Sequence, residues 1–513
     1  MFFIPNSQIF IQVLYWHCHS FGWRCQLGLG FSNIEYLHSN MMSNIINIKK
    51  GLDLPISGAA ERCITDARHI ATYAVKPTDF VGMVPRLLVA EGDSVKAGDA
   101  LFCDKKDERI RFTSPVDGTV KSVLRGDKRL LLAVVVEKGT DTKTLRDVPT
   151  TDVKEAMLQT GLWTMLRQRP FGTVANPDNT PKAIVVSCFD SAPLAPDYDF
   201  VMKGYEDDLC HGLDALASLT AGELHVSFRP DQRLAHAVEQ MSRSACKNIR
   251  IHYIAGPHPA GNVGTQIAQF CPINKGDIVW TMNPQDVAVL GHLMRTGEYR
   301  PEKTVAVAGP HIKNPHYYRI VAGACVEGIA QSQTLNPDYP QMVTPQPMAG
   351  SRIISGNVLS GTQIAPNGFV GGYDSLISIL PEGDYYDFMG WLMPGMRKYS
   401  FSRTFWSGFV PSWLHGIFHE LPQCLSPKFD TNTHGEVRPL VFTGSFERVF
   451  PFDIYPLQLI KACIIGDIEL QENLGIYEVE PEDFALCEFI DTSKTDLQPI
   501  IRQALEILRK EAM

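Results

Sequence analysis

The sequence predicts an α/β protein of several domains, and three observations lead to this fold class. Short apolar runs alternate with amphipathic segments between residues 181 and 310, which is typical of a parallel sheet covered by helices. Residues 81–137 instead alternate short β runs with Gly-Asp and Pro-Val-Asp-Gly turns. Residues 453–512 show helical periodicity. A chain of 513 residues has room for about three or four domains of roughly 150 residues each.

Composition excludes several classes of function. Hydrophobic residues make up 44% of the chain and charged residues 20%, as in ordinary folded proteins. The net charge of −9 argues against nucleic acid as a partner, because phosphate binding needs a basic face. The 12 cysteines never form CxxC, so we expect no iron–sulfur cluster and no metal site. No apolar run approaches the ~20 residues of a membrane helix, so membrane contact is expected only through partners.

Residues 1–41 differ from the rest of the chain. They are crowded with aromatic side chains and carry only Arg24 and Glu35 as charges. The cluster His17-Cys18-His19 has no second pair of ligands, which disfavours a metal site. We predict that this leader has no structural role and that translation starts at Met41 or Met42.

Residues 42–149 are predicted to form a β domain that resembles biotinyl/lipoyl carriers. The similarity rests on the stretches Glu91–Gly98 (EGDSVKAG) and Ser114–Val120 (SPVDGTV), whose turn glycines and apolar positions agree with those carriers. The slot of the carrier lysine falls near Asp107, and acidic residues flank it. We therefore expect a structural copy of the domain with no covalently attached cofactor.

A Rossmann-like α/β domain is expected over residues 150–345. It begins with a predicted helix, Val153–Gln168, followed by RPFGTVANP. Arg167 and Arg169 are candidates to hold an anion or to face an interface. The alternative is a helix end whose basic side chains satisfy carbonyl groups and the helix dipole.

The alternation in this domain gives five strands and three further helices. The predicted strands are Ala183–Phe189, Glu223–Phe228, Ile249–Ile254, Asp277–Met282 and Thr304–Ala308. The predicted helices are Glu206–Leu216, Gln232–Arg243 and Gln285–Arg295. Ligands of such sheets bind beyond the carboxyl ends of the strands. We expect the loops Asp190–Pro196, 256–264 and Gly309–Pro315 to converge on one rim.

The stretch Gly256–Trp280 contains the most distinctive loop of the chain, GPHPAGNVG. Its glycines follow a predicted strand and would let the backbone approach a ligand closely. Asn262 and Val263 stand where a P-loop needs Lys and Ser/Thr, and the spacing is not GxGxxG. The loop therefore either binds a ligand without a nucleotide fingerprint or only turns tightly.

The remainder of the chain divides into two parts. Residues 346–395 return to short strands punctuated by Gly and Asn, and predict a small β-rich, β-grasp-like unit. Residues 396–513 predict a mainly helical domain after an aromatic stretch, Tyr399–Phe418. That stretch would mark an interface if exposed and would be core if buried.

Several motifs together resemble one family over about residues 42–513. They are KKGLDLPI at 49–56, GLW at 161–163 with RPF at 169–171, GPHPAG at 256–261, QDV at 285–287, AGP at 308–310 and ERVxPxDI at 447–454. These are similar to the A subunit of the sodium-translocating NADH:quinone reductase, and GPHPAG is the most specific of them.

The resemblance implies a peripheral subunit on the cytoplasmic face of the bacterial inner membrane. It implies five partner subunits, among them a membrane subunit near the quinone site. The complex would oxidise NADH, reduce ubiquinone or a related quinone and export Na+. The resemblance places NADH, flavins, iron–sulfur centres and the Na+ path on other subunits, and associates this chain with the quinone end.

The resemblance suggests quinone-side candidates in the GPHPAG loop and in the residues that follow it. Gly256, Gly261 and Gly264 would let a flat ring approach the backbone, and Phe270 would stack on it. His258, with an unperturbed pKa of about 6.5, would donate a proton to the reduced quinone. The alternative is that His258 only orders a turn, and it carries more weight because loop histidines commonly find local partners.

Two other functions compete with the quinone-side hypothesis. One is an independent flavin- or NADH-binding oxidoreductase built on the Rossmann-like layer, which the missing glycine fingerprints disfavour. The other is a biotin or lipoyl carrier, which the acidic hairpin tip disfavours. The visible spectrum and the mass of the purified chain would separate these functions.

Overall fold

The computed structural model describes residues 45–139, 148–242, 248–330, 350–385, 389–390, 395, 397–402, 405 and 427–511. The chain separates into two units, Met1–Ile45 and Ile46–Met513, and the contacts below belong to the second. The aromatic leader with His17-Cys18-His19 lies outside the described residues, as does most of Tyr399–Phe418. No helix within the described ranges is long and apolar enough to cross a membrane.

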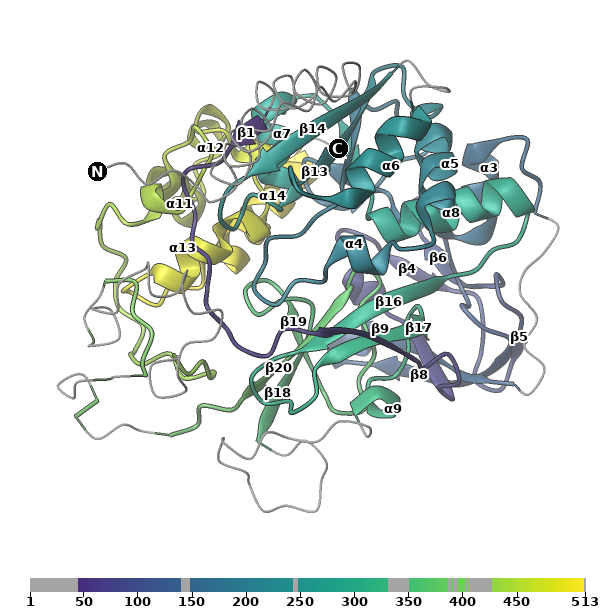
Figure 1. Ribbon diagram of the computed structural model, residues 1–513, viewed down its shortest axis with the longest axis horizontal. Coiled ribbons are helices and arrows are strands. Elements are labelled where there is room, and N and C mark those ends of the chain that lie inside the picture. Colours follow the sequence, from purple (N-terminus) through teal and green to yellow (C-terminus); the bar gives the residue numbers. More distant parts are fainter. Residues whose placement is uncertain are drawn as a thin grey trace, which may run out of the picture. The chain divides into compact units, whose positions relative to one another are not determined.

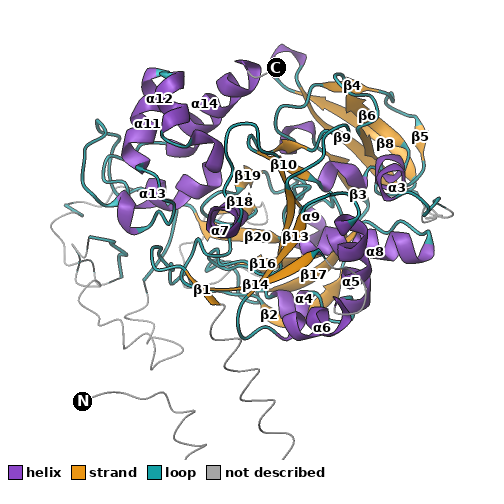
Figure 2. Ribbon diagram, turned by 90° about the horizontal axis from the view of Figure 1, so that it is seen from above, coloured by secondary structure: helices purple, strands orange, loops and turns teal. Residues whose placement is uncertain are grey.

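The N-terminal β domain consists of two small antiparallel sheets. Their strand orders are β3-β9-β8-β5 and β4-β6-β7. The strands are β3 (Thr72–Val75), β4 (Pro85–Leu87), β5 (Ser94–Val95), β6 (Ala100–Asp104), β7 (Arg111–Thr113), β8 (Gly118–Arg125) and β9 (Leu131–Lys138). Figure 2 shows them gathered beside α3. Gly92 and Gly98 both have φ of +90°, which explains why these turns need glycine. Phe102 and Phe112 stack with ring centroids 4.7 Å apart and form part of the core.

The α/β domain is built on a seven-stranded sheet of order β1-β14-β13-β12-β15-β10-β11. The strands are β1 (Ile45–Asn47), β10 (Arg167–Arg169), β11 (Thr173–Val174), β12 (Ala183–Ser187), β13 (Glu223–Phe228), β14 (Ile249–Ala255) and β15 (Val279–Thr281). The four central strands are parallel, whereas β10 runs antiparallel to both β11 and β15. Every residue of β12 is buried, as expected for a parallel strand covered on both faces.

Helices cover this sheet closely. They are α3 (Val153–Thr160), α4 (Tyr198–Val201), α5 (Glu206–Ala217), α6 (Arg233–Ser242), α7 (Val263–Phe270) and α8 (Pro284–Thr296). Ile267 of α7 packs against Val185 of β12 and Val279 of β15. Helices α5 and α8 lie side by side (Figure 1). Glycine makes this approach possible, because a Cβ on Gly291 would lie 1.7 Å from the Asp208 carbonyl oxygen.

The predicted helix Val153–Gln168 is too long. Asp152 caps its start by accepting hydrogen bonds from two backbone N–H groups, and the helix ends at Thr160. Gly161 has φ of +78°, a left-handed conformation that commonly terminates helices. A 3-10 turn, Leu162–Met165, follows, and Arg167–Arg169 then form a strand.

A second sheet joins segments that are distant in the sequence, in the order β19-β18-β20-β16-β17-β2. Its strands are β2 (Glu61–Asp66), β16 (Glu302–Ala308), β17 (His316–Val321), β18 (Ser351–Ser355), β19 (Thr362–Ile364) and β20 (Leu376–Pro381), and the short helix α9 (Glu327–Ala330) follows β17. The expectation that Thr304–Ala308 extends the parallel sheet is wrong. This strand pairs antiparallel with β17 and parallel with β20.

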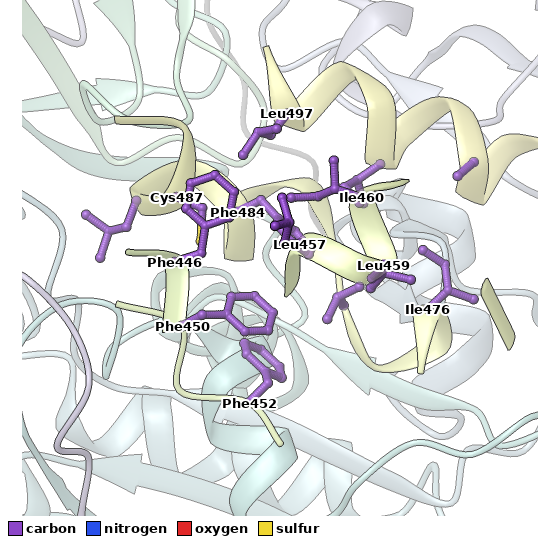
Figure 3. Close-up of a cluster of buried hydrophobic side chains, with 14 of the residues drawn as sticks. Phe446, Phe450, Phe452, Leu457, Leu459, Ile460, Ile476, Phe484, Cys487 and Leu497 are labelled. Carbon is purple, nitrogen blue, oxygen red and sulfur yellow. The ribbon is translucent and has the colours of Figure 1, made fainter. Parts of the chain in front are cut away.

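The C-terminal part of the chain carries several helices. It contains α11 (Pro456–Ile465), α12 (Ile468–Asn473), α13 (Ala485–Ile490) and α14 (Leu497–Glu511). Figure 3 shows its apolar core, in which Phe446, Phe450 and Phe452 from the segment before α11 pack against side chains of the helices. The Phe450 and Phe484 ring centroids are 4.9 Å apart. The coarse prediction of a multidomain α/β protein is thus confirmed.

Candidate functional site

The candidate site is a cavity of about 190 Å³ at the carboxyl ends of the parallel strands, called the central cavity here. The chain adds β13 and β14 on one side of β12 and β15 on the other, so the strand order reverses between β12 and β15. Such a switch point leaves a crevice in which open α/β sheets bind ligands. The cavity lining includes Ser187 at the end of β12 and the following residues Phe189 and Asp190. It also includes His258, Gly261, Asn262 and Val263 after β14, and Met282, Asn283 and Pro284 after β15.

Other parts of the chain close this cavity. Met165, Arg167 and Arg169 line it from the segment before β11, and Tyr373 lines it from the loop before β20. Glu482 comes from the C-terminal region. Two of the three loops expected at this rim therefore contribute. The third, Gly309–Pro315, contributes no lining residue, because it follows a strand of the second sheet.

His258 is 2% exposed and is held by contacts on both its ring and its backbone. Its backbone N–H donates to Asp53 Oδ1 at 2.8 Å, and its carbonyl accepts from the Leu52 N–H at 2.7 Å. The ring Nδ1 lies 3.0 Å from Ser191 Oγ, which also accepts from the Gly261 N–H at 2.7 Å. The arrangement that satisfies these groups has the serine hydroxyl donating to Nδ1 and leaves the ring proton on Nε2.

Burial lowers the pKa of His258 to about 4. The reason is that removing the ring from water disfavours its charged form. The expectation of proton donation rested on the ordinary pKa of histidine. The imidazole of His258 is instead neutral at pH 7, and it can orient a ligand by hydrogen bonding.

The three candidate glycines have different neighbours. Gly256 has φ of +141°, and a Cβ there would lie 2.3 Å from the Ile48 carbonyl oxygen. A Cβ on Gly261 would lie 2.3 Å from the Ser191 backbone nitrogen. At Gly264 a Cβ would lie 2.6 Å from Arg169 Nη1. The glycines allow close packing within the protein, and only Gly261 also lines the cavity.

Phe270 lies away from the central cavity. Its ring stacks on His252 at 4.2 Å between centroids with an interplanar angle of 6°. His252 Nε2 in turn lies 2.9 Å from Nδ1 of His225 on the neighbouring strand. The stacking partner of Phe270 is thus a histidine of β14, and the cavity lining does not include this ring.

Arg167 and Arg169 bind carboxylates of the C-terminal region. Arg167 Nη2 lies 3.0 Å from Glu480 Oε2, and its guanidinium carbon lies 5.2 Å from the centroid of the Tyr373 ring. Arg169, 3% exposed, places Nη2 2.6 Å from Glu482 Oε1 and Nη1 3.5 Å from Asp483 Oδ2. The anion that these arginines hold therefore belongs to the chain itself, and the group joins two domains.

The pKa values of two buried carboxyl groups in this cluster, Glu480 and Asp483, shift in opposite directions. The neighbouring arginines outweigh burial and lower the pKa of Glu480. For Asp483, burial outweighs Arg169 and raises the pKa to about 7. The Asp483 Oδ1 atom is buried with no hydrogen-bond partner, so no donor stabilises a negative charge on this oxygen.

Sequence reasoning missed the partners of both candidate groups. Asp53 and the acidic residues 480–483 lie about 200 to 310 residues from His258 and Arg169. The sequence does contain signals for both segments. Asp53 lies in the KKGLDLPI stretch, and Glu480 and Glu482 lie in the acidic interruption of the C-terminal helices. No group of three or more His, Cys, Asp or Glu side chains in the described ranges is arranged to hold a metal ion.

Comparison with known proteins identifies the family. A family model described as the NqrA N-terminal barrel-sandwich hybrid domain matches residues 46–139. The NqrA second alpha/beta domain matches residues 148–299, and the NQRA C-terminal domain matches residues 304–365.

Curated relatives match along their entire length. The chain is 37% identical over 480 residues to the A subunit of the Na(+)-translocating NADH-quinone reductase of Serratia proteamaculans. It is 36% identical over 478 residues to the Pasteurella multocida protein and 35% identical over 477 residues to the Vibrio atlanticus protein of the same name. Each alignment covers 91% of this chain and 100% of the relative. The chain belongs to the family formed by the A subunits of Na(+)-translocating NADH-quinone reductases.

Proposed function

We propose that this chain is the A subunit of a Na+-translocating NADH–quinone reductase and supports its quinone-reducing end. Membership of the family and full-length similarity to relatives with this name support the proposal. The complex would sit at the bacterial inner membrane, with this chain peripheral on the cytoplasmic face. Its partners would be five other subunits, in particular the membrane subunit near the quinone site.

The observation that carries the quinone assignment is the position of His258 in the wall of the central cavity. The cavity combines apolar side chains such as Phe189, Met282 and Leu359 with a few convergent polar groups, as ligand sites do. A neutral imidazole with its proton on Nε2 would donate a hydrogen bond to a quinone carbonyl oxygen. Electrons and protons for quinol formation would come from outside this chain.

The quinone role is tested in the assembled complex with His258→Gln and His258→Ala. Losing one hydrogen bond of about 1.4 kcal/mol should lower quinone-dependent turnover about tenfold. NADH-driven flavin reduction should stay normal, because that chemistry would take place on other subunits. His211→Gln is the matched control, since His211 is exposed and bonds locally to the Asp207 carbonyl. Unchanged quinone kinetics in a well-assembled His258 variant would leave only a structural role for this side chain.

We also propose that the chain holds no resident flavin and that NADH oxidation takes place elsewhere in the complex. The alternative, an independent flavin- or NADH-dependent oxidoreductase, requires a bound chromophore or NADH:quinone activity in the isolated chain. A visible spectrum and an activity assay on the purified chain decide between the two.

A further inference from the structure

We infer that a second cavity of this chain binds a small organic carboxylate. The cavity measures about 180 Å³ and lies between helices α5 and α8 and the β16–β17 hairpin, so we call it the helix–hairpin cavity. Its lining comprises Val201, Met202, Gly204, Tyr205, Asp208, Gln285, Ala288, Val289, His292, Arg295, Arg300, Glu302, Lys303, Thr304 and Arg319. None of these residues lines the central cavity, so the site is independent of the proposed quinone role.

Arg319 is the side chain of this lining that would bind the carboxylate. The other basic side chains of the lining, Arg295, Arg300 and Lys303, form ion pairs with Asp208, Glu298 and Asp286. Its Nε is buried and has no hydrogen-bond partner, and the guanidinium carbon lies 6.0 Å from the Tyr205 ring centroid. The acidic groups nearby are engaged elsewhere. Arg68 lies 2.6 Å from Asp66 and 3.0 Å from Glu302. A buried guanidinium donor without an acceptor is costly, and an incoming carboxylate would remove that cost.

A second nitrogen of the lining is also unsatisfied. His292 Nε2 is buried without a hydrogen bond and lies 3.9 Å from Glu298 Oε2, beyond hydrogen-bond distance. The other ring nitrogen lies 3.4 Å from Asp208 Oδ2. Asp208 Oδ1 accepts from Arg295 Nε and Nη2 at 3.0 and 2.7 Å, which holds this wall in place. Two nitrogen atoms of this lining, Arg319 Nε and His292 Nε2, therefore lack a hydrogen-bond partner.

The remaining lining selects the class of ligand. Val201, Met202, Ala288 and Val289 form apolar walls that suit a short aliphatic body. The planar guanidinium edge that contains Nε matches the two oxygens of a carboxylate. Asp208 and Glu302 also line the cavity and would repel a dianion such as phosphate more strongly than a singly charged carboxylate. A monocarboxylate with a few carbon atoms fits these requirements.

Calorimetric titration of the full chain with hexanoate tests the inference, with 1-hexanol and inorganic phosphate as comparison probes. We expect saturable one-to-one binding of hexanoate, at least tenfold weaker binding of hexanol and no binding of phosphate. Arg319→Gln should weaken hexanoate at least tenfold, and Val289→Phe should block it by filling the cavity. Arg250→Gln is the matched control, because Arg250 is exposed and pairs with Glu223 on the other sheet.

Thermal unfolding without ligand checks that each variant is folded. If Arg319→Gln does not fold, Arg319→Lys and Val289→Phe carry the test: the lysine variant should bind hexanoate more weakly than the wild type. Absence of saturable hexanoate binding to the wild type would overturn the inference. Equal affinity for hexanol, or undiminished hexanoate binding in the folded Arg319 and Val289 variants, would overturn it as well.

Discussion

Gln285 on α8 hydrogen-bonds both backbone groups of Thr304 on β16. Its Nε2 donates to the Thr304 carbonyl at 3.0 Å, and its Oε1 accepts from the Thr304 N–H at 2.8 Å. Strand β20 pairs with β16 only from Ala306 onward, so the glutamine replaces a missing neighbouring strand. One side chain thereby joins the α/β domain to the second sheet.

Gln285→Ala should lower the free energy of unfolding by roughly 2–4 kcal/mol. The substitution leaves two buried backbone groups unsatisfied, each of which costs ~1–3 kcal/mol. Urea unfolding of the full chain measures the loss. Gln363→Ala, at an exposed position of β19, is the control and should change stability by less than ~0.5 kcal/mol. A loss at Gln285 no larger than this control would contradict the prediction.

Arg169→Met should destabilise the protein by ~3–5 kcal/mol. The buried carboxylate of Glu480 would lose a counter-ion, and a buried uncompensated charge is strongly unfavourable. Hydrogen exchange should locate the effect in residues 480–490. Arg250→Met removes an exposed pair and should cost less than ~1 kcal/mol. Equal losses of stability in the two variants would show that the buried cluster stabilises the protein no more than an exposed ion pair does.

Asp483→Asn should change how stability depends on pH. Burial raises the folded-state pKa of Asp483 to about 7, whereas the unfolded value is about 3.9. Between these values the folded protein holds a proton that the unfolded chain has released, so the free energy of unfolding falls as pH rises. The variant should lack this fall, which amounts to at most ~4 kcal/mol between pH 4 and 7. Urea unfolding across this range, wild type minus variant, measures it; parallel curves would refute the raised pKa.

Gly291→Ala should cost at least ~2 kcal/mol. The added methyl group would collide with the Asp208 carbonyl oxygen and force α8 away from α5. Thermal unfolding should show the loss. Gly139→Ala is a suitable control, because a Cβ there meets nothing closer than 3.7 Å. A variant as stable as the wild type would mean that the helices can shift apart at little cost.

The purified chain should be colourless and should have the mass of its unmodified sequence. The hairpin tip between β6 and β7 carries Asp107, which Arg109 binds through Nε and Nη2 at 2.9 and 2.7 Å. A carrier needs an apolar-flanked lysine at this position. Intact mass spectrometry of protein from its native host would reveal an added biotinyl or lipoyl group, and absorbance would reveal a flavin. Either finding would refute the prediction.

Sequence patterns predicted individual strands and helices of the α/β domain well, because the apolar spacing that favours each element lies within the element itself. The apolar run at Glu223–Phe228 coincides with β13, and the helix expected at Glu206–Leu216 ends one residue later in the structure. The helix expected at Val153–Gln168 instead ends before Gly161. That glycine is visible in the sequence, but the helical spacing of the apolar residues, which continues to Leu162, favours a longer helix.

The sequence pattern does not show which strands pair when they are far apart along the chain. The strand at Glu302–Ala308 has the same apolar character as the parallel strands, and only its partners show that it belongs to another sheet. The stacking of Phe270 on His252 is another contact between distant parts of the chain that the sequence does not indicate. The loop that brings His258 to the central cavity was predictable, since a parallel sheet places the loops after its strands together. Arg169 instead reaches the cavity from β10, an antiparallel strand that the sequence did not predict.

The second sheet has a consequence for synthesis of the protein on the ribosome. Strand β2 ends at Asp66, and its partner β17 begins at His316, so about 250 residues must be made before β2 can pair. At ~5–20 residues per second this delay is on the order of ten to fifty seconds. All six residues of β2 are exposed in the folded protein, and the segment is largely polar, ERCITD. Until β17 has been made, the unpaired β2 segment therefore exposes little apolar surface to which chaperones or neighbouring chains could bind.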